Sequence, residues 1–338
     1  NLDALYRLVK GSRKFLAVPL RLSMTDAEVA RFAVHQQGDE AELRRFVGEV
    51  QRIVATERDV FGEFPDYEPG RYTFLADYLP WASGDGMEHR NSTVITAPAA
   101  IRSSRTQLLD TVAHEFFHNW NVERIRPASL EPFDFERANM SAELWLAEGF
   151  TQYYGPLALR RANLVDMSDS VASFQTLLRS VIEGPGRQVR SAEDMSRMAP
   201  FTDGGRTIEP TNWSNTYISY YPYGGAIALG LDLTLRDRYD GRITLDDYMR
   251  ALWRVHGAPG GARPGYVDHP YTLADAQQRL AEVTSDAAFA ADFFARYIDG
   301  HEVVDYARLV ARAGFVLRKR HAGQAWMGDL RLEARGGQ

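Results

Sequence analysis

Two histidines and a glutamate form a pattern that can hold a metal ion and use it. His114 and His118 are four residues apart, and Glu115 directly follows the first of them. On an α-helix, residues i and i+4 lie on one face, so both imidazoles can reach one metal ion. Glu115 is rotated by about 100° from His114, so its carboxylate can take a proton from a metal-bound water without ligating the metal. This HExxH pattern is typical of zinc peptidases.

The residues around the motif predict the helix that this chemistry requires. Apolar side chains recur at helical spacing over residues 108–117, and Ser103 and Ser104 are candidate N-caps. Pro127 disfavours the helical conformation in the residue before it, so we expect the helix to end between residues 121 and 126. The alternative is a core helix with two surface histidines.

Glu148 is the first candidate for the third protein ligand that a catalytic zinc needs beside its open position. The chain has no cysteine, and Glu148 follows His118 by 30 residues, in a helix that we expect to begin after Ser141. Within the apolar run 144–150, a carboxylate is costly to bury unless a partner such as zinc neutralises it. Glu143 is the second candidate, although its place near the helix start favours an interaction with the helix dipole. A surface carboxylate is the alternative without a metal.

Three segments of the sequence are similar to motifs of a known family. They are Gly86–Thr93 (GMEHRNST), His114–Pro127 (HEFFHNWNVERIRP) and Leu144–Thr151 (LWLAEGFT). These segments resemble the substrate-binding strand, the active-site helix and the third-ligand helix of the glycyl aminopeptidase family, which comprises bacterial and archaeal zinc peptidases of the gluzincin type. The likeness extends from about residue 40 to about residue 315.

The resemblance implies a role for each residue of the metal site. One Zn²⁺ per chain would be held by His114, His118 and Glu148. The metal would polarise the scissile carbonyl of a peptide and lower the pKa of its bound water. Glu115 would act first as general base and then as general acid.

The resemblance also implies which part of a substrate is bound by Gly86, Met87 and Glu88. Glu88 would form a charge-assisted hydrogen bond with the free α-ammonium group of a peptide, which is the property of an aminopeptidase. Gly86 and Met87 would contact the same substrate. We expect residues 92–96 to form an edge strand, which could hold an extended peptide by main-chain hydrogen bonds. A solvated turn residue is the alternative for Glu88.

The tetrahedral intermediate of peptide hydrolysis needs a hydrogen-bond donor besides the metal. Residues 215–225 (NTYISYYPYGG) resemble the Tyr-Tyr-x-Lys-Gly stretch of the family, which implies Tyr221 as this donor and Tyr220 as the alternative. Tyr223 stands where lysine is common in the family. A run of aromatic residues that packs the mouth of a cleft is the interpretation without chemistry.

Composition excludes several other classes. The 338 residues are 45% hydrophobic and can bury a substantial core. The net charge of −6 argues against a nucleic-acid partner. We expect no membrane span and see no signal peptide at the first residues. The absence of cysteine permits either the cytoplasm or an exported location. The excess of arginine over lysine indicates a GC-rich bacterial genome. The sequence leaves the oligomeric state open.

The predicted fold class is α+β, as in a thermolysin-like bilobal zinc peptidase. We expect residues 1–102 to form a mixed β/α lobe with the substrate-binding strand, and residues 103–318 to form a mainly helical zinc-peptidase lobe. Residues 319–338 resemble only the lead-in to the PDZ domain of the family, so the chain resembles an excised catalytic core. Residues 184–214 are rich in Gly, Pro and polar side chains and are expected to form a long loop that could roof the cleft.

Together these features predict a zinc-dependent aminopeptidase that acts on peptides with a free N-terminus. A preference for N-terminal glycine or alanine comes from the resemblance alone. Two alternatives stay open: a zinc endopeptidase of the same fold, and a non-catalytic binding module that keeps the metal as a structural element. The intact Glu115 argues against the second, because a structural site needs no base.

Overall fold

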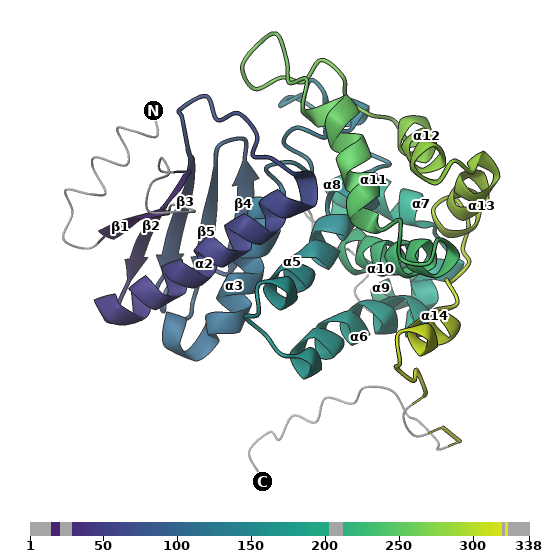
Figure 1. Cartoon of the computed structure of the whole chain (residues 1–338), viewed down its shortest axis with the longest axis horizontal. Coiled ribbons are helices and arrows are strands. Elements are labelled where there is room, and N and C mark those ends of the chain that lie inside the picture. Colours follow the sequence, from purple (N-terminus) through teal and green to yellow (C-terminus); the bar gives the residue numbers. More distant parts are fainter. Residues whose placement is uncertain (1–14, 21–28, 203–211, 320–321, 324–338) are drawn as a thin grey trace.

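A mixed five-stranded sheet forms one side of the molecule in the computed structural model, which describes residues 15–20, 29–202, 212–319 and 322–323 (Figure 1). The strands are β1 Phe15–Leu20, β2 Ala30–Gln36, β3 Tyr72–Tyr78, β4 Asp85–His89 and β5 Ser92–Ala97. In the order β1-β2-β3-β5-β4, the three central strands are parallel and the two outer strands are antiparallel to their neighbours. The expectation that residues 92–96 form an edge strand is wrong: β5 pairs with β3 and with β4, and β4 lies at this edge of the sheet and is called the edge strand below.

Two helices cover one face of the sheet. They are α2 Glu40–Phe61 and α3 Ile101–Phe117. Aromatic rings join both helices to the strands: Phe46 of α2 lies 5.8 Å from Phe32 of β2, and Phe116 of α3 lies 5.4 Å from Phe74 of β3, as ring centroids. Phe32 and Phe74 also stack on each other. Because α3 further contacts β5 and β4, it is held beside the edge strand.

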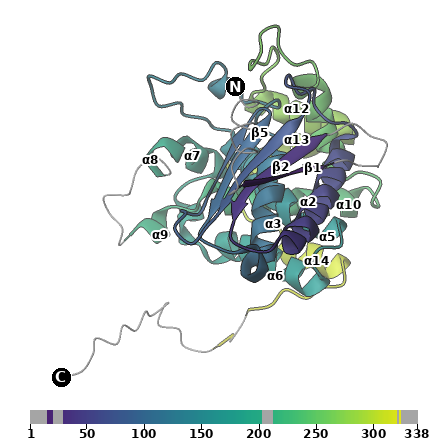
Figure 2. The ribbon, with the colours of Figure 1, turned by 90° about the vertical axis from the view of Figure 1, so that its left-hand side faces the viewer.

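The second part of the chain is mainly helical, and it lies beside the sheet and its two helices (Figures 1 and 2). Its α-helices are α4 Leu144–Ala147, α5 Gly149–Arg161, α6 Met167–Glu183, α7 Ala192–Arg197, α8 Ala199–Thr202, α9 Trp213–Thr216, α10 Tyr220–Arg238, α11 Leu245–Leu252, α12 Leu273–Thr284, α13 Ala287–Tyr297 and α14 Tyr306–Arg312. Short 3₁₀-helices lie at Ala128–Leu130 and Pro185–Gln188, and a π-helical turn at Trp253–Gly257 follows α11. The predicted α+β class, with a mixed β/α first part and a mainly helical second part, is confirmed.

Both predicted ends of α3 are wrong. The helix begins at Ile101, with Ala100 as an N-cap that makes no side-chain hydrogen bond, and Ser104 breaks the regular helix with φ −130° and ψ 22°. The helix ends at Phe117, well before Pro127, and the residues that follow it form turns. Val122 in this turn has φ 116°, a conformation that no α-helix contains.

The helix predicted after Ser141 begins later and is divided in two. Glu143 is the N-cap of α4, and Glu148 separates α4 from α5. The long loop predicted at residues 184–214 instead holds Pro185–Gln188 and the short helices α7, α8 and part of α9. Its role as a roof over the cleft stays a prediction, and residues 203–211 lie outside the described part.

The predicted tail at residues 319–338 lies almost entirely outside the described residues, as do residues 1–14. Within the described ranges, no helix combines the length and the apolar character that crossing a bilayer requires.

Candidate functional site

Three side chains converge on one point at the junction of the two parts of the molecule. His114 Nε2 lies 3.1 Å from His118 Nε2, and Glu148 Oε2 lies 3.4 Å and 3.2 Å from these two nitrogens. A tetrahedral zinc with ligand distances of roughly 2.0–2.1 Å has ligand atoms roughly 3.3–3.4 Å apart. Two imidazoles and one carboxylate are also a ligand set of catalytic zinc. The residues therefore fit a zinc ion.

The main chain explains how these three side chains meet. His114 lies in the last turn of α3, and His118 is the residue after its end. His118 keeps a helical conformation, with φ −61° and ψ −17°, so the two histidines still lie on one face. Glu148 lies at the break between α4 and α5, and α5 packs against α3. The break therefore places the carboxylate opposite the two imidazoles.

Asn121 joins the two helical segments behind the site. Its main-chain oxygen accepts a hydrogen bond from His118 Nδ1 at 2.8 Å, which leaves Nε2 of this ring toward Glu148. Its side-chain amide donates to the main-chain oxygens of Leu146 and Ala147 and to Thr151 Oγ1, at 2.9–3.1 Å. The sequence analysis missed Asn121, although it lies inside the segment that resembles the active-site helix.

Glu143, the other candidate for the third ligand, has different partners. Its Oε2 accepts hydrogen bonds from Ser129 Oγ at 2.9 Å and from Ser141 Oγ at 2.8 Å. Among the described residues, the groups able to surround one metal ion include Glu148 and not Glu143. The geometry thus favours Glu148, and it gives Glu143 a structural part in the turn before α4.

Glu115 lies beside the converging atoms and faces the edge strand. Only 5% of this residue is exposed, and its Oε2 has no hydrogen-bond partner among the described residues. Burial raises the pKa of Glu115 to about 7. A Cβ added to Gly86 of β4 would lie 2.1 Å from Glu115 Oε1, so a larger residue there would displace this carboxylate from its position. Glycine at position 86 therefore shapes the pocket around Glu115.

Glu88 faces the same site from the edge strand. It pairs with Thr93, which pairs with Phe74, so all three side chains point to the face that α3 covers. Its carboxylate lies within 4.8 Å of ligand atoms of Glu115 and His118. Burial raises the pKa of Glu88. A partly buried carboxylate at this distance is suited to a cationic group of a ligand.

Met87 is not oriented like its neighbours. Along β4, the residues at positions 86 and 88 are partly buried, whereas Met87 is 53% exposed on the opposite face. Its main-chain oxygen accepts a hydrogen bond from Thr93 Oγ1 at 2.9 Å. The side chain of Met87 therefore points away from the face that carries Glu88.

Arg124 fixes the edge strand relative to the metal helix. It is almost fully buried, and its guanidinium donates to the main-chain oxygens of Arg90, Asn119 and Asp66 at 2.7–2.9 Å. Arg90 lies in the turn directly after β4, two residues after Glu88. One side chain thus ties this turn to the segment that follows α3.

Tyr221 stands across the site, at the start of α10. Its ring stacks on His114, with centroids 5.9 Å apart and an angle of 27°. A pocket of about 270 Å³ is lined by His114, Glu115, Gly86 and Tyr221, among others. Tyr220 is 3% exposed and packs in the core, so of the two candidate phenols Tyr221 is the one that lines the pocket.

Glycines allow α10 to approach so closely. A Cβ on Gly149 would lie 2.3 Å from Gly224 Cα, and a Cβ on Gly224 would lie 2.0 Å from the main-chain oxygen of Trp145. The main chains of α10 and of the α4–α5 junction are therefore in direct contact. This contact brings the first turn of α10, with Tyr221, next to the segment that carries Glu148.

Comparison with solved structures agrees with the fold described above. Among solved structures, an aminopeptidase N family protein from Idiomarina loihiensis is 23% identical, with a TM-score of 0.77 over 90% of this chain and 50% of that chain. A two-domain M1 zinc metallopeptidase bound to L-arginine is 16% identical, with a TM-score of 0.53 over 86% of this chain and 52% of that chain. These likenesses show the fold, and the chain spans about half the length of either structure.

The family comparison covers the part of the chain with the metal-site helices. None of the curated proteins compared matches the sequence. The family model described as M61 glycyl aminopeptidase matches residues 107–227, a range that holds both histidines, Glu115, Glu148 and Tyr221. This segment of the chain is similar to the M61 glycyl aminopeptidase family, in agreement with the resemblance of its sequence motifs.

Proposed function

We propose that the chain is a zinc-dependent aminopeptidase. His114, His118 and Glu148 would hold one zinc ion, and the observation that carries this assignment is the convergence of their three ligand atoms within 3.4 Å. When bound, zinc would polarise the scissile carbonyl and make a coordinated water more acidic. The family and the likeness to zinc metallopeptidases support the same reading.

The residues around the metal position have separate roles in this proposal. Glu115 takes a proton from the attacking water and later delivers it to the leaving amine, which its position beside the ligand atoms supports. Tyr221 donates its phenol proton in a hydrogen bond to the oxyanion. Glu88 binds the α-ammonium group of the substrate and so limits cleavage to the first peptide bond.

The substrate would be a peptide with a free N-terminus that begins with glycine or alanine. This preference follows from the family, and the test is the hydrolysis of glycyl, alanyl and leucyl arylamides by the zinc-loaded chain. We expect the glycyl and alanyl compounds to be cleaved faster than the leucyl compound, and a chelator to abolish all three rates. Cleavage that persists without metal would contradict the mechanism, and a leucyl preference would contradict the substrate assignment.

A further inference from the structure

Asp110 is a carboxylate beside the candidate metal site that has no part in the mechanism described above. It lies on α3 one turn before His114, and both residues line the pocket of about 270 Å³ at the site. Its Oδ1 is buried and accepts no hydrogen bond from the described residues. Burial raises the pKa of Asp110, against the opposing effect of the charge on His114. Because a buried carboxylate oxygen without a donor is costly, Oδ1 needs a partner from the pocket.

The His114 ring has one nitrogen left for such a partner. Among the described residues, its contacts with His118 and Glu148 both use Nε2, so Nδ1 remains. A helical side chain leans toward the N-terminus of its helix and covers the residue four positions earlier, which for His114 is Asp110. His118 has a different acceptor for the same atom, since its Nδ1 bonds the main-chain oxygen of Asn121. Asp110 is therefore placed to serve Nδ1 of His114.

Helix α5 leaves room for the Asp110 carboxylate. A Cβ added to Gly155 would lie 3.2 Å from Asp110 Oδ1 and 3.8 Å from the main-chain nitrogen of His114, so α3 and α5 meet closely here. The next residue, Pro156, has no N–H, so the main-chain oxygen of Gln152 lacks the donor that residue 156 of a regular helix supplies. Gln152, Gly155 and Pro156 all line the same pocket. The wall beside His114 thus offers two acceptors, and no lysine or arginine is among the described residues that line the pocket.

We propose that Asp110 is a positioning residue of the metal site, which accepts a hydrogen bond from His114 Nδ1 through a water in the pocket and so holds the ring with Nε2 toward the metal. A water that receives the Nδ1 proton can donate to Asp110 Oδ1 and to the main-chain oxygen of Gln152, which satisfies all three groups. The inference rests on the proposed zinc site and goes beyond it, because Asp110 does not ligate the metal. Groups that orient a metal-bound imidazole in this way typically raise metal affinity by about 10- to 100-fold.

Zinc affinity, measured by competition with a chromophoric chelator, tests this role. We expect Asp110→Ala to bind zinc about 10- to 100-fold more weakly than the wild type. Asp110→Asn keeps an oxygen that can accept the same hydrogen bond, so it should lose less affinity than Asp110→Ala. Wild-type affinity in Asp110→Ala would overturn the inference, and so would equal losses in the two variants. A wild-type chain that binds no zinc would overturn the proposed function, and this inference with it.

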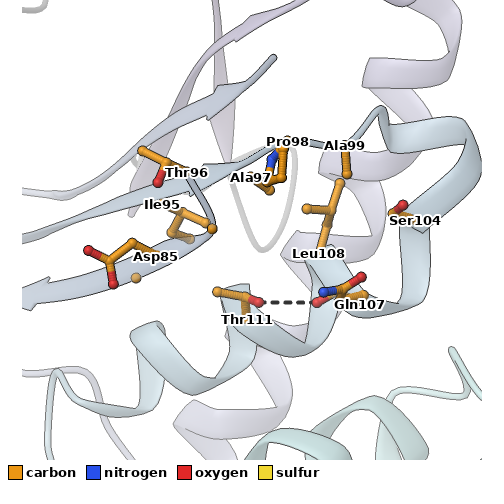
Figure 3. Close-up of a pocket in the computed structure, with 12 residues that line it drawn as sticks. Asp85, Ile95, Thr96, Ala97, Pro98, Ala99, Ser104, Gln107, Leu108 and Thr111 are labelled. Atoms are coloured by element: carbon orange, nitrogen blue, oxygen red, sulfur yellow. Dashed lines mark hydrogen bonds between the residues drawn. The ribbon is translucent and has the colours of Figure 1, made fainter. Parts of the chain in front are cut away.

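Asp85→Ala is the matched control for the charge of the pocket. Asp85 is exposed and lines the same pocket from β4, and in Figure 3 its carboxylate points away from Thr111, the neighbour of Asp110 on α3. This variant removes one negative charge from the strand side of the pocket, so its zinc affinity should stay close to that of the wild type. Equal losses in Asp85→Ala and Asp110→Ala would reduce the effect to pocket charge and overturn the inference.

Unfolding of the metal-free protein separates positioning from a structural role. Asp110 Oδ1 has no donor among the described residues to lose, so Asp110→Ala should unfold with nearly the wild-type free energy when a chelator is present. Chemical denaturation monitored by circular dichroism measures this quantity. A decrease large enough to account for the lost zinc affinity would make the role of Asp110 purely structural and overturn the inference.

Discussion

Glu115 and Glu148 carry the same functional group in different surroundings. Burial alone would raise the pKa of Glu148, but the imidazoles of His118 and His114 outweigh it and hold that pKa well below its usual range. Glu115 instead lies against Gly86, and burial raises its pKa to about 7. The first carboxylate is thus suited to ligate a cation, and the second to exchange a proton.

The replacement Glu115→Gln should separate metal binding from turnover. Because the Glu115 carboxylate lies beside the converging ligand atoms, the variant should retain about one equivalent of zinc while kcat falls by about 10²- to 10⁴-fold. Metal analysis and a glycyl arylamide assay on the same preparation check both parts. Loss of zinc from the variant would make Glu115 a ligand and refute the division of roles.

The pair Glu148→Ala and Glu143→Ala should identify the third ligand. Two histidines alone form a poor zinc site, so Glu148→Ala should bind zinc far more weakly. Glu143→Ala removes hydrogen bonds from Ser129 and Ser141 and should retain zinc at wild-type affinity. Competition with a chromophoric chelator measures both affinities. The reverse result would transfer the ligand role to Glu143.

At the scale of elements, the α4–α5 junction carries Glu148 and the start of α10 carries Tyr221. The contact between these two segments holds the two residues together at the site. Gly149→Ala should disturb this contact, since the new Cβ would lie 2.3 Å from Gly224 Cα. We expect a loss of about 1–3 kcal/mol in the free energy of unfolding, together with reduced turnover as Tyr221 moves. Chemical denaturation monitored by circular dichroism gives the free energy.

Gly48 of α2 provides the control for this glycine replacement. Gly48 is exposed in the interior of α2, and a Cβ there meets no atom within 4 Å. Gly48→Ala should therefore stabilise the protein by about 0.4–1 kcal/mol and leave turnover unchanged. If Gly149→Ala and Gly48→Ala changed the free energy of unfolding and the turnover equally, the result would contradict a role for close main-chain packing at Gly149.

The elements that local signals control were predicted well. The sequence also predicts a helix from about residue 40 to residue 61, and α2 has these bounds, because Asp39 caps its first turn and Gly62, with φ 91°, ends it. It likewise predicts a strand at residues 72–78, and β3 has these bounds. The ends of α3 and the break at Glu148 depend on contacts with distant segments, such as the hydrogen bonds from Asn121 to Leu146 and Ala147. Local sequence carries no signal for such contacts.

At the scale of the whole molecule, the site is assembled from both parts of the chain. The sheet supplies Gly86 and Glu88, and the helical part supplies Glu148 and Tyr221, on either side of α3. The HExxH pattern and the segment similarities predicted His114, His118 and Glu148, whose ligand atoms converge in the structure. They could not predict the edge position of β4, because strand order is decided by long-range pairing, nor the outward direction of the Met87 side chain.

A metal held between the two parts should stabilise the fold. Zinc at 100 times its dissociation constant would add about 2.7 kcal/mol to the free energy of unfolding. We therefore expect Tm to rise by several degrees with zinc and to fall back with a chelator. Glu115→Gln should show the same rise, and Glu148→Ala should show little. Differential scanning calorimetry measures Tm. A wild-type Tm that does not change with zinc would argue against a metal site that joins the two parts.

The central claim is that Glu88 anchors a free N-terminus beside a catalytic metal. The most direct measurement compares kcat/KM of the zinc-loaded chain for Gly-Phe-Ala amide and for its N-acetylated form. Acetylation removes the ammonium group and leaves a partly buried carboxylate without its partner, which costs about 2–5 kcal/mol. The account predicts that acetylation lowers kcat/KM by about 30- to 4,000-fold, and that Glu88→Ala loses most of this discrimination. Equal cleavage of the two peptides by the wild type would contradict the account and make the chain an endopeptidase.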